Sequence, residues 1–154
     1  MGRVIGSVVV GYVVMVIVVF CLSSAAWLAL GADGAFQPGT FDPSAIWIAV
    51  NIIVGLVAGI GGGWVAAIVA RSDARALWGL VGLVAVLGIL FAVPVLTRGD
   101  VPSVVRGETM SMMEAMQNAR MPAWIALLNP VLGVVGSFFG FRMRKTAAAA
   151  PVAV

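Results

Sequence analysis

Residues 45–70 have the sequence AIWIAVNIIVGLVAGIGGGWVAAIVA, which contains no charged side chain. A helix of roughly 20 apolar residues, rising about 1.5 Å per residue, crosses a bilayer core of about 30 Å. This stretch is therefore long and apolar enough to form a transmembrane helix. Its glycines are typical of helices that pack closely against neighbours inside a membrane.

Three further uncharged apolar stretches cover about 4–30, 76–97 and 122–141. The whole chain is 62% apolar and 10% charged, whereas soluble domains have about 45–50% apolar and about 25% charged residues. This composition excludes an ordinary soluble enzyme, a disordered chain and a nucleic-acid binder. We expect an all-α integral membrane protein, a bundle of four transmembrane helices forming one domain over 1–145. A disordered Ala- and Pro-containing tail is expected over 146–154.

The distribution of basic residues predicts the orientation. Six of the nine basic residues precede the first stretch, separate the second from the third, or follow the fourth: Arg3, Arg71, Arg75, Arg142, Arg144 and Lys145. Cytoplasmic loops are enriched in Lys and Arg, so both termini are expected in the cytoplasm. Four tryptophans near the ends of the stretches are expected to anchor them at the membrane interfaces: Trp27, Trp47, Trp78 and Trp124. The preference for Ala, Gly, Val and Arg favours a GC-rich bacterial genome, and hence a bacterial inner membrane.

Glycines at spacings of three or four predict the packing faces of the second and fourth helices. They are Gly55, Gly59 and Gly63 in the second and Gly133, Gly136 and Gly140 in the fourth. Such spacings keep the glycines on one helix face, where small residues let two backbones approach. Asn51 and Asn129 extend these faces at a similar depth. We expect both amides to face the bundle interior and to hydrogen-bond each other.

The same two helices share a weak sequence match, Trp-Ile-Ala followed by Asn and Gly, which suggests a duplication; chance similarity is the alternative. Pro94 and Pro130 are expected to kink their helices because proline removes one helical hydrogen bond. The triple glycine at 61–63 is interpreted as a tight helix crossing. An unwound segment at a transport site is the alternative.

The loop over 98–121 is expected outside the cell and contains five of the eight methionines. Its pattern predicts a short amphipathic helix lying on the outer membrane surface. Thioether sulfur selects Cu(I), so Met112, Met113 and Met116 are a possible metal site. A plain apolar helix face is the favoured interpretation, and no cofactor is expected.

The remaining chemistry is sparse. The chain has no histidine and one cysteine, Cys21, which excludes a thiol redox pair or a thiolate zinc site. We expect a non-enzymatic membrane protein, an accessory or scaffold subunit that acts through helix packing. The alternatives are a small oligomeric transporter or channel for a neutral solute and a Cu(I)-handling protein. The expected partners are the lipid bilayer and another membrane protein or a second copy of the chain, but not nucleic acid.

Overall fold

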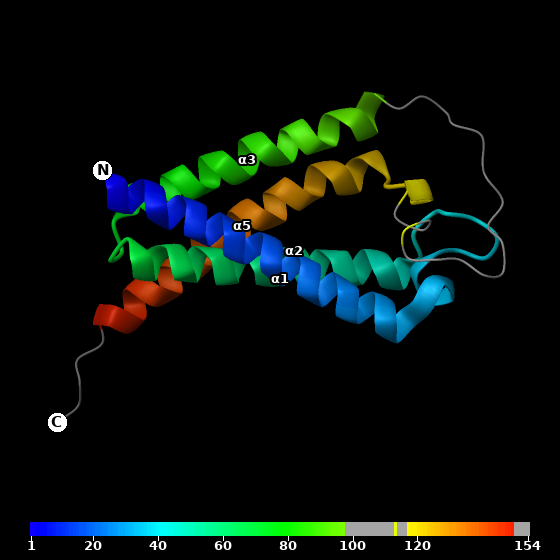
Figure 1. The fold of residues 1–154 in the computed structure, drawn as a ribbon, viewed down its shortest axis with the longest axis horizontal. Coiled ribbons are helices and arrows are strands. Elements are labelled where there is room, and N and C mark those ends of the chain that lie inside the picture. Colours follow the sequence, from blue (N-terminus) through cyan, green and yellow to red (C-terminus); the bar gives the residue numbers. More distant parts are fainter. Residues whose placement is uncertain (98–112, 114–116, 150–154) are drawn as a thin grey trace.

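A computed structural model shows four long α-helices (Figure 1) and describes residues 1–97, 113 and 117–149. The helices are α1 (Gly2–Ala35), α2 (Ala45–Val69), α3 (Ala74–Thr97) and α5 (Ala123–Ala149). Each is long and apolar enough to cross a membrane, and the described part of the chain contains no β-strand. The prediction of an all-helical protein with four helices of membrane-spanning character is confirmed.

The helix boundaries follow local chemistry. α1 extends to Ala35, but Gly31 interrupts it with φ 63° and ψ −173°, a conformation that is essentially restricted to glycine. α5 continues to Ala149, four residues into the segment predicted to be disordered. Alanine has the highest helix propensity, so the Ala-rich sequence prolongs the helix. Half of the residues 110–121, where the surface helix is predicted, lie outside the described residues, including Met112 and Met116.

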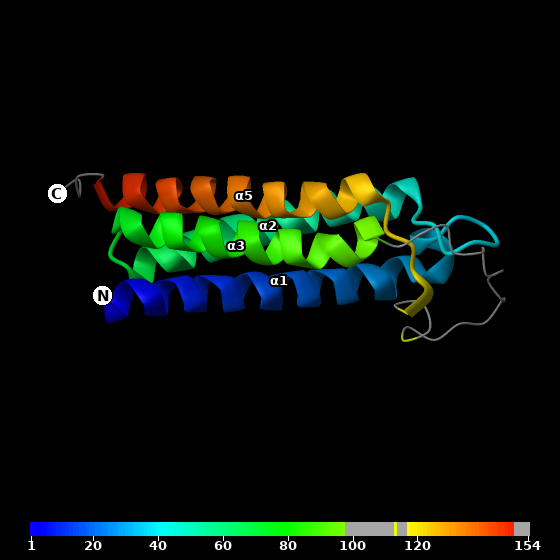
Figure 2. The same cartoon turned by 90° about the horizontal axis from the view of Figure 1, so that it is seen from above.

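The start of α1 and the end of α5 lie at one end of the molecule, together with the turn between α2 and α3 (Figures 1 and 2). We call this the terminal end, and the opposite end, with the α1–α2 connection, the loop end. At the α2–α3 turn, Arg71 and Ser72 both adopt positive φ values, 54° and 63°. The Ser72 N–H donates to the Ala67 carbonyl at 2.8 Å, and the Asp73 carboxylate accepts from the Arg75 N–H at 2.9 Å. The first bond caps the C-terminal end of α2, and the second caps the N-terminal end of α3.

The α1–α2 connection is held at the loop end by Ser44 and by four aromatic rings. The Ser44 hydroxyl accepts from the Trp47 N–H at 3.0 Å and donates to the Gly34 carbonyl, which joins the two helix ends. We call the four rings the aromatic cap: Trp27, Phe36, Phe41 and Trp47. Neighbouring rings meet edge to face with centroids 5.8–6.1 Å apart, a favourable arrangement for aromatic pairs.

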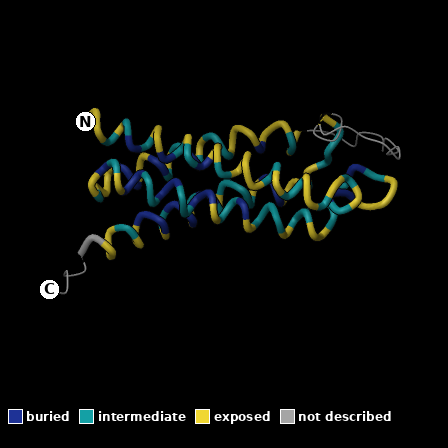
Figure 3. Tube along the Cα trace, turned by 60° about the horizontal axis from the view of Figure 1, so that its bottom comes forward, coloured by how far each residue is buried: buried dark blue, intermediate teal, exposed yellow. Residues whose placement is uncertain are grey.

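The remaining core lies in the middle of the molecule and toward the terminal end (Figure 3). Met15, Leu80 and Val84 are buried in the middle, whereas Leu77 and Phe141 are buried near the terminal end. α2 and α5 form the central pair of helices. In the most apolar 18-residue segment of each, 39% of the residues are buried, compared with 17% in α1 and in α3. The latter two helices therefore present most of their apolar surface to the surroundings.

Candidate functional site

The predicted glycine faces meet where α2 crosses α5. A Cβ atom on Gly59 would lie 2.9 Å from the Gly133 carbonyl oxygen and from the Gly136 Cα atom. Side-chain atoms on Gly63 or Gly140 would collide with the backbone of the opposite helix. Gly55 is looser, with its nearest neighbour in the Leu132 side chain at 3.5 Å. The crossing thus brings the two backbones together over about two helical turns.

The triple glycine serves two crossings at once and remains helical. Gly62 faces α1, where it packs against the Gly11 carbonyl and Met15, whereas Gly63 faces Ser137 of α5. A Cβ atom on Gly61 would have no neighbouring atom within 4 Å. Successive helical residues point about 100° apart, so adjacent glycines open two different faces. Sequence reasoning missed Gly11, because the small residue four positions before it is Ser7 and not a second glycine.

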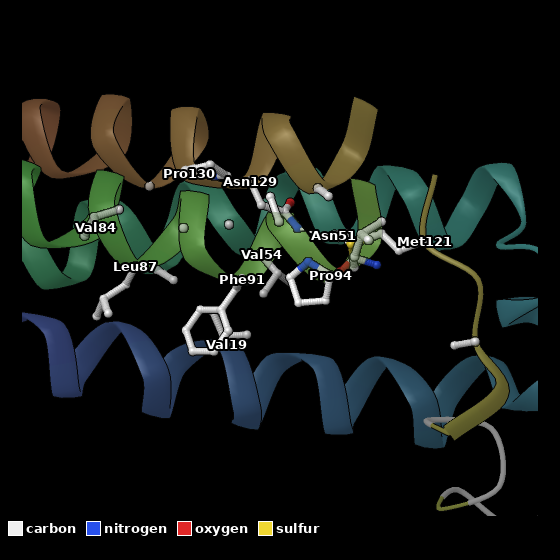
Figure 4. Close-up of a pocket in the computed structure, with 18 of the residues that line it drawn as sticks. Val19, Asn51, Val54, Val84, Leu87, Phe91, Pro94, Met121, Asn129 and Pro130 are labelled. Atoms are coloured by element: carbon white, nitrogen blue, oxygen red, sulfur yellow. Dashed lines mark hydrogen bonds between the residues drawn. The ribbon is translucent and has the colours of Figure 1, made fainter. Parts of the chain in front are cut away.

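A cavity of about 870 Å³ lies between the four helices in the half nearer the loop end. All four helices contribute to its walls, and residues 117–121 close part of it. Its walls are mainly apolar, with Val54, Val84, Leu87 and Phe91 among them (Figure 4). Its volume falls in the range of about 300–1,000 Å³ that is typical of small-molecule sites.

Asn51 and Asn129 both line this cavity (Figure 4). The predicted hydrogen bond between them is wrong. The Asn51 amide donates to the Trp47 carbonyl on its own helix at 2.9 Å, and the Asn129 amide nitrogen contacts the Met121 sulfur at 4.0 Å. The side-chain carbonyl oxygens of the two residues make no hydrogen bond within the described part of the chain. Each can therefore accept a hydrogen bond from a molecule in the cavity.

Pro130 adds a further polar group to the same wall. Proline lacks an N–H, so the carbonyl of Ala126, which lines the cavity, loses its usual helical donor. The Pro130 ring packs against Gly88 of α3, where a Cβ atom would collide with it. Pro94 also lines the cavity and lies inside α3. α3 and α5 continue through their prolines without a non-helical residue.

Residues 117–121 connect this wall to the aromatic cap. The Arg120 N–H donates to the Phe41 carbonyl at 3.0 Å, and Ala119 packs against the cap. Phe41 is only 4% exposed and lines the cavity. Gln117 and Asn118 line the cavity beside them. The loop end of the cavity is therefore partly covered and carries most of its polar side chains.

A second hollow, of about 520 Å³, runs along α1 and meets the cavity at Tyr12, Val19 and Ala119. We call it the α1 groove. Its other lining residues are mostly apolar or aromatic: Val16, Phe20, Ser23, Ser24, Trp27, Phe36 and Trp47. Phe20 is 70% exposed, so the groove lies at the surface of the helices, next to the interior cavity. Sequence reasoning gave no indication of it.

The chemistry available in the cavity is mainly hydrogen bonding by neutral groups, and Arg120 is the one charged residue among the described lining residues. Tyr12 and Arg120 are the titratable residues among its described lining residues. No group of three or more His, Cys, Asp or Glu residues that could hold a metal ion occurs in the described ranges. Met113 is 64% exposed, and the other two candidate copper ligands lie outside the described residues. The arrangement therefore suits an uncharged, largely apolar molecule.

No protein-family model, curated protein or solved structure shows significant similarity to the chain. The fold itself defines the class: a helical protein whose four long helices have the length and apolar character of membrane spans.

Proposed function

We propose that this is a bacterial inner-membrane protein that binds a neutral, largely apolar molecule within a four-helix transmembrane bundle, as a small transporter or carrier. The cavity at Asn51 and Asn129 carries this proposal, because two amides with free acceptor oxygens line an otherwise apolar hollow. Polar groups inside a membrane protein face the bundle interior or a cavity and mark ligand pathways.

The orientation belongs to the same proposal: both termini in the cytoplasm and the loop end outside. The terminal end carries Arg71, Arg75 and the basic residues of α5, in agreement with the distribution of Lys and Arg in cytoplasmic loops. The test uses Gln37→Cys and Arg75→Cys, each in a Cys21→Ser background, because both positions are exposed at opposite ends. A membrane-impermeant maleimide should label the first in intact cells and the second only after permeabilisation; the reverse pattern would invert the topology.

Thiol labelling of the cavity wall tests the binding function. Asn129→Cys places a thiol on the wall, and Val131→Cys, two residues later and 53% exposed outside the cavity, is the matched control. The thiolate is the reactive species and forms poorly in apolar surroundings. A hydrated, accessible cavity should therefore make Asn129→Cys react with a small water-soluble maleimide about tenfold faster or more, as expected for a shift of one pKa unit. Equal, slow labelling of both variants would refute a solute site.

A second candidate function, an accessory subunit, is favoured by the asymmetry of burial. α1 and α3 leave most of their apolar surface uncovered, with 17% of the most apolar window buried in each. In a membrane, lipid or a partner helix covers such faces. Native mass spectrometry of gently extracted protein discriminates the two functions, because an accessory subunit should carry a second polypeptide. A homo-oligomer without a companion would favour the transporter.

A further inference from the structure

We infer that the bound molecule is a single-chain amphiphile with a neutral hydrogen-bonding head group, which places its head in the cavity and its hydrocarbon chain in the α1 groove. This inference rests on the proposed binding function and names its ligand class. It follows from three properties of the two hollows: their connection, their different linings and the position of the groove on a membrane-spanning helix.

The two hollows are adjacent, and the proposal joins them into one path. Tyr12, Val19 and Ala119 belong to the lining of both. A compact solute of a few atoms needs only the cavity and leaves the groove unexplained. The cavity and the groove measure about 870 Å³ and 520 Å³, so together they accommodate an extended molecule that turns from the interior onto the surface of α1.

The linings divide the path into a polar and an apolar part. The cavity is lined by Asn51, by Asn129 and by Ala126, whose carbonyl Pro130 leaves without its helical donor. The groove contains Val16, Phe20 and the faces of the cap rings, and its described polar groups are limited to serine and tyrosine hydroxyls and tryptophan N–H groups. A head group with hydroxyls therefore finds acceptors in the cavity, while a chain finds apolar surface in the groove.

The surroundings of the groove determine the nature of the chain. Phe20 and Val19 are exposed on α1, a helix long and apolar enough to span a membrane. In a bilayer the groove would open toward lipid hydrocarbon, so its occupant is in contact with acyl chains on one side. A hydrocarbon chain satisfies this environment without leaving a polar group unpaired.

The head group is neutral on the same evidence. The described lining residues include no carboxylate that could pair with a cationic head group, and they offer the amides of Asn51 and Asn129 as hydrogen-bonding groups. The one basic residue among them, Arg120, already interacts with another part of the protein. A charged head without a countercharge would be costly at this depth. Monoacylglycerol has the required chemistry, with two hydroxyl donors on a single chain, and serves as the probe.

The test measures protection of a Leu87→Cys thiol by monooleoylglycerol, in the Cys21→Ser background and in proteoliposomes. Leu87 lines the cavity and is not one of the proposed head-group acceptors. Glycerol monoacetate, which has the same head without the long chain, is the control compound. At about ten times its dissociation constant, the amphiphile should slow labelling about tenfold, whereas the monoacetate at the same concentration should have no effect. Protection by both compounds alike, or by neither, would overturn the inference and leave the proposed solute site intact. Absence of labelling without any added compound would instead refute the proposed function itself.

A pair of groove variants locates the chain. Ser24→Phe fills the α1 groove, and Leu22→Phe adds the same ring to α1 at a position outside the groove lining. Protection by monooleoylglycerol should be lost in Ser24→Phe and retained in Leu22→Phe, while basal labelling of Leu87→Cys stays the same in both. Retained protection in Ser24→Phe would show that the chain does not lie in the groove and would overturn this placement.

Discussion

Replacing Gly63 by alanine should force α2 and α5 apart. The new Cβ atom would lie 2.7 Å from the Ser137 Cα atom and 2.8 Å from the Ser137 carbonyl carbon, with the carbonyl oxygen nearer still. Carbon atoms normally approach to about 3.5–4.0 Å, so the helices must separate by roughly 0.7 Å or more at this point. All three obstacles are backbone atoms and cannot rotate away. Overpacking of this kind costs about 1–3 kcal/mol.

Gly61→Ala is the matched control, because no atom lies within 4 Å of the position of its Cβ. Alanine favours a helix over glycine by about 0.8–1.0 kcal/mol in water, and this gain cancels when the two variants are compared. Reversible unfolding in mixed micelles, followed by circular dichroism during a titration with a denaturing detergent, measures the difference. Gly63→Ala should be less stable than Gly61→Ala by about 1–3 kcal/mol. Equal stability of the two variants would refute the close α2–α5 crossing.

Three further changes test other contacts, the first two in the same unfolding assay and the third by hydrogen exchange. Ser137→Ala removes a hydroxyl that is fully buried and donates to the Gly133 carbonyl at 2.7 Å. The free energy of unfolding should fall by about 0.6 kcal/mol and by no more than about 1.7 kcal/mol. A larger fall would contradict a role limited to this hydrogen bond within α5. Gly88→Ala drives a methyl group into the rigid Pro130 ring and should be less stable than Gly61→Ala by about 1–3 kcal/mol, whereas equal stability of these two variants would rule out this contact. Phe41→Ala removes a ring of the aromatic cap that is 4% exposed. Amide hydrogen exchange over residues 35–44 should then become faster, while exchange in α2 beyond its first turn stays slow. An equal increase of exchange in both segments would argue against a cap that opens separately from the helices.

The glycine spacing was informative about the α2–α5 crossing because a repeat of three or four residues keeps small side chains on one face. The same reasoning failed for the two asparagines. Their spacing places them at one cavity, but side-chain rotation directs Asn51 to the Trp47 carbonyl on its own helix. A backbone acceptor four residues earlier is always within reach of a short polar side chain. Periodicity shows which face a residue occupies and does not show which partner its side chain selects.

Hydropathy alone determined that the chain contains four long apolar helices, since each span is a local property of about 20 consecutive residues. Local chemistry also indicated the glycine faces. The cavity, the α1 groove and the aromatic cap depend on how the helices cross and diverge. They arise only when Tyr12, Phe41, Asn51 and Asn129, from distant parts of the sequence, come together. Tertiary packing decides these features, because an empty volume is defined by the several helices that surround it and belongs to no single one of them.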